Sequence, residues 1–262
     1  MEIGNLARPT DLDAALELIR KERGVAVGGG LWLRMSSKPM GLAVDLGGLG
    51  LDYIRDSGGD IEIGAMTPFR RLETSALLAE RFGAFFRDAV GGVVGVQFRN
   101  MATVGGTVAG RYAFAGLNAA LLALGAKVVL RGEGTKDFAS FLSEPRNESF
   151  LVEKVLLPSG CRAGYASVGL TEGDFRILIA AAAFVGGSWR VVVGARPGAA
   201  RLCDTATKEL GSDAKPSGAA IEKAAVAAAA EAAFADDLRS SAEYRREVCP
   251  VLVRRAVSEA LK

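Results

Sequence analysis

The chain has 262 residues, of which 50% are hydrophobic, enough for one large domain or two modest ones with real cores. Its 32 basic and 30 acidic residues nearly balance, which argues against a nucleic-acid-binding surface or an acidic tail. Histidine is absent, and this excludes a His-dependent triad, a His metal site and an imidazole proton relay within the chain.

The three cysteines, Cys161, Cys203 and Cys249, lie far apart and form no Cys-x-x-Cys pair. This spacing argues against a zinc ribbon or a cysteine-ligated iron–sulfur cluster, so we expect three ordinary thiols. The sequence has no run of 18 apolar residues, so we expect no membrane span. The first residues lack the basic-then-apolar pattern of a secretory signal, and we expect a cytoplasmic protein.

Helical and strand patterns alternate up to residue 158. Apolar residues recur at helical spacing from Leu12 to Ile19, and we expect Thr10 to cap this helix and Gly24 to end it. A hairpin turn is expected at Gly58-Gly59, and no regular structure is expected in the polar segment 131–147. The pattern predicts strands at 25–27, 43–46, 49–54, 60–63, 127–130 and 150–157, and helices at 67–79, 81–97 and 117–126.

Pro158-Ser159-Gly160 marks the expected domain boundary. The pattern beyond it predicts three successive strands that form an antiparallel sheet, at 162–170, 176–185 and 189–193. Two helices are expected to follow, at 221–235 and 243–261, and the arginines of the last helix, including Arg245, are expected to face solvent.

Two glycine-rich stretches lie next to apolar strands. Gly28-Gly29-Gly30 directly follows the strand at 25–27, and Gly105-Gly106 is flanked by Thr103 and Thr107. Adjacent glycines permit φ > 0 and a close approach of the backbone to a ligand. Successive free N–H groups in such a turn bind phosphate-like anions, although glycine pairs also mark ordinary turns. Neither stretch has the spacing of a P-loop or of a Rossmann fingerprint.

In this order along the chain, the motifs resemble the FAD-binding medium subunit of the molybdenum hydroxylases, the family of xanthine dehydrogenase and carbon monoxide dehydrogenase. The resemblance covers nearly the whole chain. It rests on Gly28-Gly29-Gly30, Asp45-Leu46, Ile63–Thr67, Arg99–Thr107, Gly194–Pro197 and Ser241–Arg245.

The resemblance implies an α+β fold in two domains. The first is a PCMH-type FAD-binding domain over residues 1–158, with subdomains of about 1–50 and 51–158. The second, over residues 161–262, resembles the C-terminal domain of CO dehydrogenase flavoproteins, with a three-stranded antiparallel sheet and helices.

The implied cofactor is FAD, with its pyrophosphate between the two glycine-rich loops. Because the flavin carries the chemistry, we expect no catalytic side chain and no metal ligand in this chain. Carried over position by position, the FAD-binding residues are Val27, Gly28, Gly29, Gly30, Leu31, Trp32, Ala102, Thr103, Gly105, Gly106, Thr107 and, near the adenine, Val152.

The implied function is electron transfer within a multi-subunit enzyme. Electrons would pass from [2Fe–2S] clusters on a small subunit, which serves a molybdopterin-containing large subunit, through FAD to an external acceptor. A flavin-free scaffold that docks partner chains stays open as an alternative, as does a stand-alone flavoprotein of the wider PCMH group.

Three positions depart from the family pattern. Leu31 replaces the usual hydroxyl residue, Gly116 a common Asp, and Ser167 a common basic residue. A lost hydrogen bond to a charged or buried group costs roughly 1–3 kcal/mol. We therefore expect FAD to bind more weakly or less specifically than is typical of the family.

Overall fold

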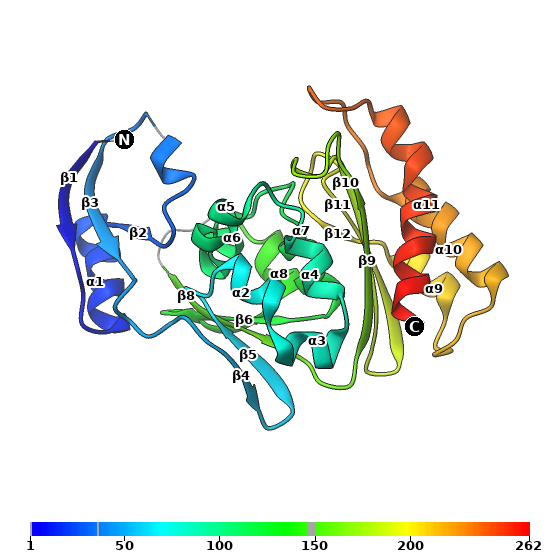
Figure 1. Cartoon of the computed structure of the whole chain (residues 1–262), viewed down its shortest axis with the longest axis horizontal. Helices are drawn as coiled ribbons and strands as arrows, with labels where there is room; N and C mark the ends of the chain where they lie inside the picture. The colour runs from blue at the N-terminus through cyan, green and yellow to red at the C-terminus, as the bar shows by residue number, and fades with distance from the viewer. Residues whose placement is uncertain (1, 36, 146–149) are drawn as a thin grey trace.

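The first part of the chain is a small parallel sheet with one helix across it (Figure 1). The computed structural model describes residues 2–35, 37–145 and 150–262. Strands β1 (Ile3–Ala7), β2 (Val25–Val27) and β3 (Met40–Asp45) lie in the order β1-β3-β2, and both pairings are parallel. Helix α1 (Leu12–Glu22) connects β1 to β2 and buries its apolar face against the sheet.

The ends of α1 differ from the sequence prediction. Asp11, not Thr10, is the N-cap, because its carboxylate accepts a 2.8 Å hydrogen bond from the Ala14 N–H. At the other end Arg23 takes the left-handed conformation, with φ of 53°, and Gly24 follows the cap. Strand β1 was not predicted, since most of its residues are exposed and show no buried face.

The middle part is an antiparallel sheet of five strands in the order β4-β5-β8-β6-β7, covered on one face by helices (Figure 1). The predicted hairpin at Gly58-Gly59 is confirmed, since both glycines have positive φ between β4 and β5. The strands are β4 (Ile54–Ser57), β5 (Asp60–Gly64), β6 (Lys127–Arg131), β7 (Gly134–Asp137) and β8 (Leu151–Leu157). The helices are α2 (Phe69–Thr74), α3 (Ala76–Phe82), α4 (Phe85–Val90), α5 (Val96–Met101), α6 (Val104–Gly110), α7 (Gly116–Ala123) and α8 (Phe138–Ser143).

Four sequence predictions fail in this part. The strand predicted at 49–54 is displaced, because β4 covers Ile54–Ser57 and residues 49–53 form no strand. The predicted helix 67–79 is two helices, because Ser75 is extended and caps α3 with its hydroxyl. The predicted helix 81–97 is interrupted between α4 and α5, where Gly91 and Gly92 lie. The segment 131–147 contains β7 and α8, which the buried rings of Phe138 and Phe141 anchor in the core. Residues 146 and 147 of this segment lie outside the described residues.

The C-terminal part is a four-stranded antiparallel sheet in the order β12-β11-β10-β9. The three predicted strands are present as β9 (Arg162–Val168), β10 (Leu178–Val185) and β11 (Ser188–Gly194), and β12 (Arg201–Leu202) adds a short fourth. Helices α9 (Asp204–Leu210), α10 (Gly218–Glu231) and α11 (Ala242–Ala260) pack on its outer face (Figure 1).

Strand β10 is buried on both faces, which explains its run of alanines. Ile179, Ala181 and Ala183 join the core beneath the middle helices, whereas Leu178 and Ala180 join the core formed with α9, α10 and α11. Small side chains let both layers approach the sheet closely. The C-terminal sheet therefore packs directly on the middle part and helps to form its core.

Arg245 contradicts the expected solvent-facing arginines of the last helix, because only 1% of its surface is exposed. Its guanidinium donates to backbone carbonyls of two other segments, and this compensates for its burial. Within the described residues, none of the helices has the length and hydropathy needed to cross a bilayer.

Candidate functional site

The first glycine-rich stretch lies directly against the second. A Cβ on Gly29 would lie 1.5 Å from the carbonyl oxygen of Met101, and a Cβ on Gly28 would lie 2.8 Å from Thr103 Oγ1. Gly30 has φ of 69°, a conformation that glycine adopts without steric cost. Only glycine fits at position 29. The contact with Met101 therefore requires glycine there, whether or not a ligand binds.

The second stretch corrects a sequence prediction. Gly105 and Gly106 do not form a positive-φ turn but lie inside α6, whose N-cap is Thr103. The reason is packing, because a Cβ on Gly105 would lie 2.7 Å from the Cβ of Ala65. Glycine, a poor helix former, is used here for close approach to β5 and the residues after it.

The backbone donors of the two stretches are used differently. In the second stretch the N–H groups of Val104 and Gly105 donate to carbonyls at 3.0 and 2.7 Å, and that of Gly106 donates to Thr103 Oγ1 at 3.2 Å. In the part of the chain that the structure describes, no hydrogen bond is donated by the N–H groups from Gly29 to Leu31. The free donors for an anion therefore lie in the first stretch.

Both stretches line one cavity of about 390 Å³, a size typical of small-molecule sites. Among the residues predicted from the sequence, those that line it are Gly28, Gly29, Gly30, Leu31, Trp32, Ala102, Thr103, Gly106 and Thr107. The other three are not among its lining residues. Val27 pairs with Asp45 in the parallel sheet, Gly105 packs on Ala65, and Val152 pairs with Leu130 in the middle sheet.

Four aromatic rings that pack against one another also line the cavity, and we call them the aromatic wall: Trp32, Tyr112, Phe114 and Phe175. The Trp32 ring lies 5.3 Å from Tyr112, 5.5 Å from Phe114 and 5.7 Å from Phe175, measured between centroids. Phe114 and Phe175 are 4.6 Å apart. The four rings of the wall come from three segments: the end of the first glycine stretch, the segment after α6 and the C-terminal part.

Sequence reasoning found only one member of the aromatic wall, Trp32. Tyr112 and Phe114 lie a few residues beyond the glycine pair, and their alternate spacing was an available signal. Phe175 reaches the wall from the loop between β9 and β10, and nothing near it in the sequence marks it.

The three departures from the family pattern have different surroundings. Leu31 lines the cavity and packs partly against the main core. Gly116 also lines the cavity, and a Cβ there would lie 2.4 Å from the carbonyl oxygen of Ala89 and 2.6 Å from the Tyr165 hydroxyl. Ser167 lies in β9 and pairs with Ile179. No side chain therefore fits at position 116 without movement of its neighbours.

A mostly buried ion pair between Arg99 and Glu73 fixes the helix that precedes the second stretch. Arg99 donates from Nε to Glu73 at 2.9 Å and from Nη1 to the Val93 and Val94 carbonyls at 3.3 Å. Burial alone would raise the pKa of Glu73, but hydrogen bonds from Arg99 and Arg70 outweigh it and lower this pKa. The pair fixes α5, which carries Phe98 and Met101 to the cavity.

The cysteines take no part in the site. Burial raises the pKa of Cys161 to about 11 and those of Cys203 and Cys249 to about 12, which leaves them as unreactive thiols near neutral pH. Among the residues that the structure describes, no group of acidic or cysteine side chains is placed to hold a metal ion.

The cavity as a whole fits FAD, because its lining has both free amide donors for phosphate oxygens and an aromatic wall for a ring. Residues 2–160 match the family described as the FAD binding domain in molybdopterin dehydrogenase, and residues 171–260 match the CO dehydrogenase flavoprotein C-terminal domain.

Individual relatives agree with both matches. The chain is 31% identical to the carbon monoxide dehydrogenase medium chain of Afipia carboxidovorans, over 83% of this chain and 80% of that one. It is 30% identical to the 6-hydroxypseudooxynicotine dehydrogenase complex subunit alpha of Paenarthrobacter nicotinovorans, over 81% of this chain and 76% of that one. A solved structure of reconstituted CO dehydrogenase from Oligotropha carboxidovorans superposes with a TM-score of 0.88 at 26% identity, covering 100% of this chain and 98% of that one.

Fold and site together define a flavoprotein subunit of an oxidoreductase. The chain belongs to the family of FAD-binding medium subunits of molybdenum hydroxylases, and its cofactor is FAD. The α+β fold predicted from the sequence is confirmed.

Proposed function

We propose that FAD binds in the cavity between the two glycine-rich stretches and that the chain serves as an electron-transfer subunit. The observation that carries this proposal is the make-up of the cavity lining, which combines the unused N–H groups of Gly29 to Leu31 with the aromatic wall. When bound, FAD supplies the electron-transfer chemistry between a partner's iron–sulfur cluster and an external acceptor.

The residues of the chain position and shield the cofactor. The N–H groups from Gly29 to Leu31 would hold the pyrophosphate, since they are free and line the cavity. Gly28 and Gly106 line the cavity without side chains of their own. Trp32, Phe114 and Phe175 would shield the ring of the bound cofactor from water.

The proposed site residues are those named from the sequence, with different weights. The residues from Gly28 to Trp32, with Ala102, Thr103, Gly106 and Thr107, are supported by the geometry, since they line the cavity. Val27 and Gly105 act through packing, and Val152 depends on the family resemblance alone. We also keep the domain boundary at 158–160 as a proposal, supported by the passage from β8 to β9 at this point.

A glycine-to-aspartate pair tests the site. A Cβ on Gly106 meets only Thr103 Oγ1, at 3.0 Å, so Gly106→Asp adds a negative charge to the cavity and requires a small shift of the Thr103 side chain. Gly218→Asp is the matched control, since nothing lies within 4 Å of that position at the start of α10. Calorimetric titration with FAD should show saturable binding for the wild type and the control, and none for Gly106→Asp. Equal binding by all three proteins would contradict the proposed site.

We further propose that the partners are a molybdopterin-containing large subunit and a [2Fe–2S] small subunit. The support is that relatives are named as a medium chain and as a subunit of a dehydrogenase complex. Co-expression with candidate partner chains and purification through a tag on this chain should yield a flavin-containing complex whose iron–sulfur clusters reduce the flavin. Recovery of this chain alone would contradict the proposal.

The flavin-free scaffold stays as a second candidate because of one observation. The N–H groups of Val104 to Gly106, expected to hold phosphate, are already used within the protein. A complex with partner chains that contains no flavin, even after incubation with FAD, would favour this candidate.

A further inference from the structure

An arginine of the C-terminal part lies over the aromatic wall. The Arg239 guanidinium is 5.3 Å from the ring centroid of Phe175 and 6.0 Å from that of Phe114. A guanidinium at this distance over a ring is attracted by the negative face of the ring. Arg239 therefore contacts two rings that line the cavity although it is not itself a lining residue.

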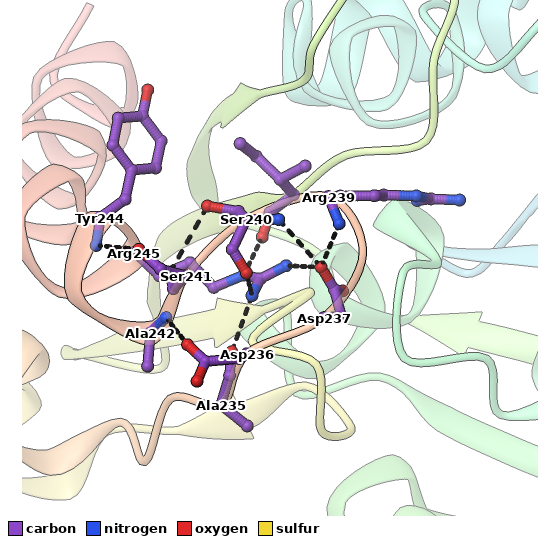
Figure 2. Close-up of polar contacts among 10 residues, drawn as sticks. Ala235, Asp236, Asp237, Arg239, Ser240, Ser241, Ala242, Tyr244 and Arg245 are labelled. Atoms are coloured by element: carbon purple, nitrogen blue, oxygen red, sulfur yellow. Dashed lines mark hydrogen bonds and ion pairs between the residues drawn. The ribbon is translucent and has the colours of Figure 1, made fainter.

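The loop that carries Arg239, residues 235–241, is fixed mainly by the carboxylate of Asp237, and Asp236 adds a hydrogen bond that it accepts from the Ala242 N–H at 2.6 Å. Asp237 Oδ1 accepts hydrogen bonds from the N–H groups of Arg239 at 2.8 Å and Ser240 at 3.1 Å. The same oxygen pairs with Arg245 Nη2 at 2.8 Å. Figure 2 shows these contacts converging on Asp237, with the Arg239 side chain extending away from them. The backbone of residue 239 is thus held in one place.

The buried Arg245 ties this loop to the segment that carries Phe175. Its Nη1 donates to the carbonyls of Ala235 at 2.7 Å and Ser240 at 2.8 Å, and its Nε donates to the carbonyl of Ile177 at 2.9 Å. Ile177 is two residues beyond Phe175. One side chain therefore fixes both segments whose residues, Arg239 and Phe175, meet at the aromatic wall.

We propose that Arg239 is a positioning residue that fixes the aromatic wall and thereby sets the affinity of the cavity for the aromatic part of its ligand. This inference rests on the proposed function. The expected consequence is preorganisation, because rings held in place before binding lose less freedom when a ligand packs on them. Loss of the two contacts between the Arg239 guanidinium and the rings should raise the Kd for FAD about three- to tenfold, the size of effect expected for cation–π contacts at a half-buried site.

Three arginine variants isolate this role. Arg239→Gln removes the cation, Arg239→Lys keeps it, and Arg246→Gln is the control, since Arg246 is an exposed arginine on the same helix as Arg245. Asp237→Asn is a second variant that weakens the hold on the loop without touching the rings. The first measurement is the Kd for FAD by calorimetry, with the thermal midpoint of each protein.

The second measurement needs no ligand. The chain has two tryptophans, and Trp189 is 1% exposed, so acrylamide quenching of the ligand-free protein reports mainly on Trp32. Because Trp32 contacts Phe114 and Phe175, loosening these rings should make Trp32 more accessible to the quencher.

The proposal expects Arg239→Gln to raise the Kd for FAD about three- to tenfold and to increase quenching of Trp32, with Arg239→Lys in between and Arg246→Gln unchanged. Asp237→Asn should act in the same direction. Weaker FAD binding with unchanged quenching would overturn it, since Arg239 would then act on the ligand directly. Identical behaviour of Arg239→Gln and Arg246→Gln would also overturn it. If the wild type binds no FAD, the proposed function fails, and the quenching comparison still decides whether Arg239 fixes the wall.

Discussion

Gly29 and Met101 are in contact through their backbones, and a Cβ on Gly29 would lie 1.5 Å from the Met101 carbonyl oxygen. This contact joins the loop after β2 to the end of α5, two segments more than seventy residues apart in the chain. The small parallel sheet is thus held against the middle part at the cavity. The same glycine supplies one of the free N–H groups that we assign to the phosphates.

We predict that Gly29→Ala separates these two segments. Because the colliding atom is backbone, the loop must move, and we expect a loss of about 3 kcal/mol in the free energy of unfolding together with loss of FAD binding. Gly41→Ala is the control, since nothing lies within 4 Å of that glycine. Chemical denaturation and FAD titration of both variants check this. A Gly29→Ala protein with wild-type stability and affinity would refute the contact.

Gly105 and Ala65 offer a test by compensation. Gly105→Ala should destabilise the protein by about 1–3 kcal/mol, because its Cβ would lie 2.7 Å from that of Ala65. Adding Ala65→Gly should recover part of this loss, since the Ala65 carbonyl oxygen remains 3.0 Å away. A double-mutant cycle measured by urea denaturation gives the coupling directly. Strictly additive effects would mean that the two residues do not touch.

Gly116→Asp, which places the common family residue in this chain, should not strengthen FAD binding. The new Cβ would meet the Ala89 carbonyl and the Tyr165 hydroxyl within 2.6 Å, so we expect a loss of at least about 2 kcal/mol in stability. Thermal denaturation and FAD titration check this prediction. A variant that binds FAD more tightly at unchanged stability would show that the surroundings of Gly116 adapt easily.

The Glu73–Arg99 pair should make the protein sensitive to acid. Because the folded-state pKa of Glu73 is lowered, its contribution to stability is present above its unfolded pKa of about 4.5 and is lost as pH falls through the lower folded value. Glu73→Gln should cost about 3 kcal/mol at pH 7, because it leaves the buried guanidinium of Arg99 without a carboxylate partner.

This cost of Glu73→Gln should shrink below pH 4.5, where the wild type loses the same interaction. Urea denaturation from pH 3 to pH 7 measures the difference between the two proteins. Glu247→Gln, at an exposed position on α11, is the control. A difference that does not depend on pH would contradict the assignment.

The sequence predicts an element correctly when the residues that determine its structure lie close to it in the chain. Strands such as β2 and β8 were found because short apolar runs end at glycine or proline. The break at Ser75 was missed because no glycine or proline marks it. The two-residue β12 is too short to carry a pattern.

The site shows the same division. The sequence marks both glycine-rich stretches but predicts a turn at Gly105-Gly106, because Ala65, on which Gly105 packs, lies far away in the chain. The buried Arg245 and the ring of Phe175 were missed because their partners come from other segments. A glycine-rich stretch indicates that the backbone closely approaches another group, and only the fold shows which group that is.

The most direct test of the central claim, that FAD binds in the cavity lined by the two glycine-rich stretches and the aromatic wall, is an FAD titration followed by Trp32 emission. Trp32→Phe serves as the reference, because its remaining emission comes from Trp189 in the core outside the cavity. We predict saturable quenching of the Trp32 component with one flavin bound per chain. Unchanged Trp32 emission, with all the flavin recovered in the ultrafiltrate, would contradict the account.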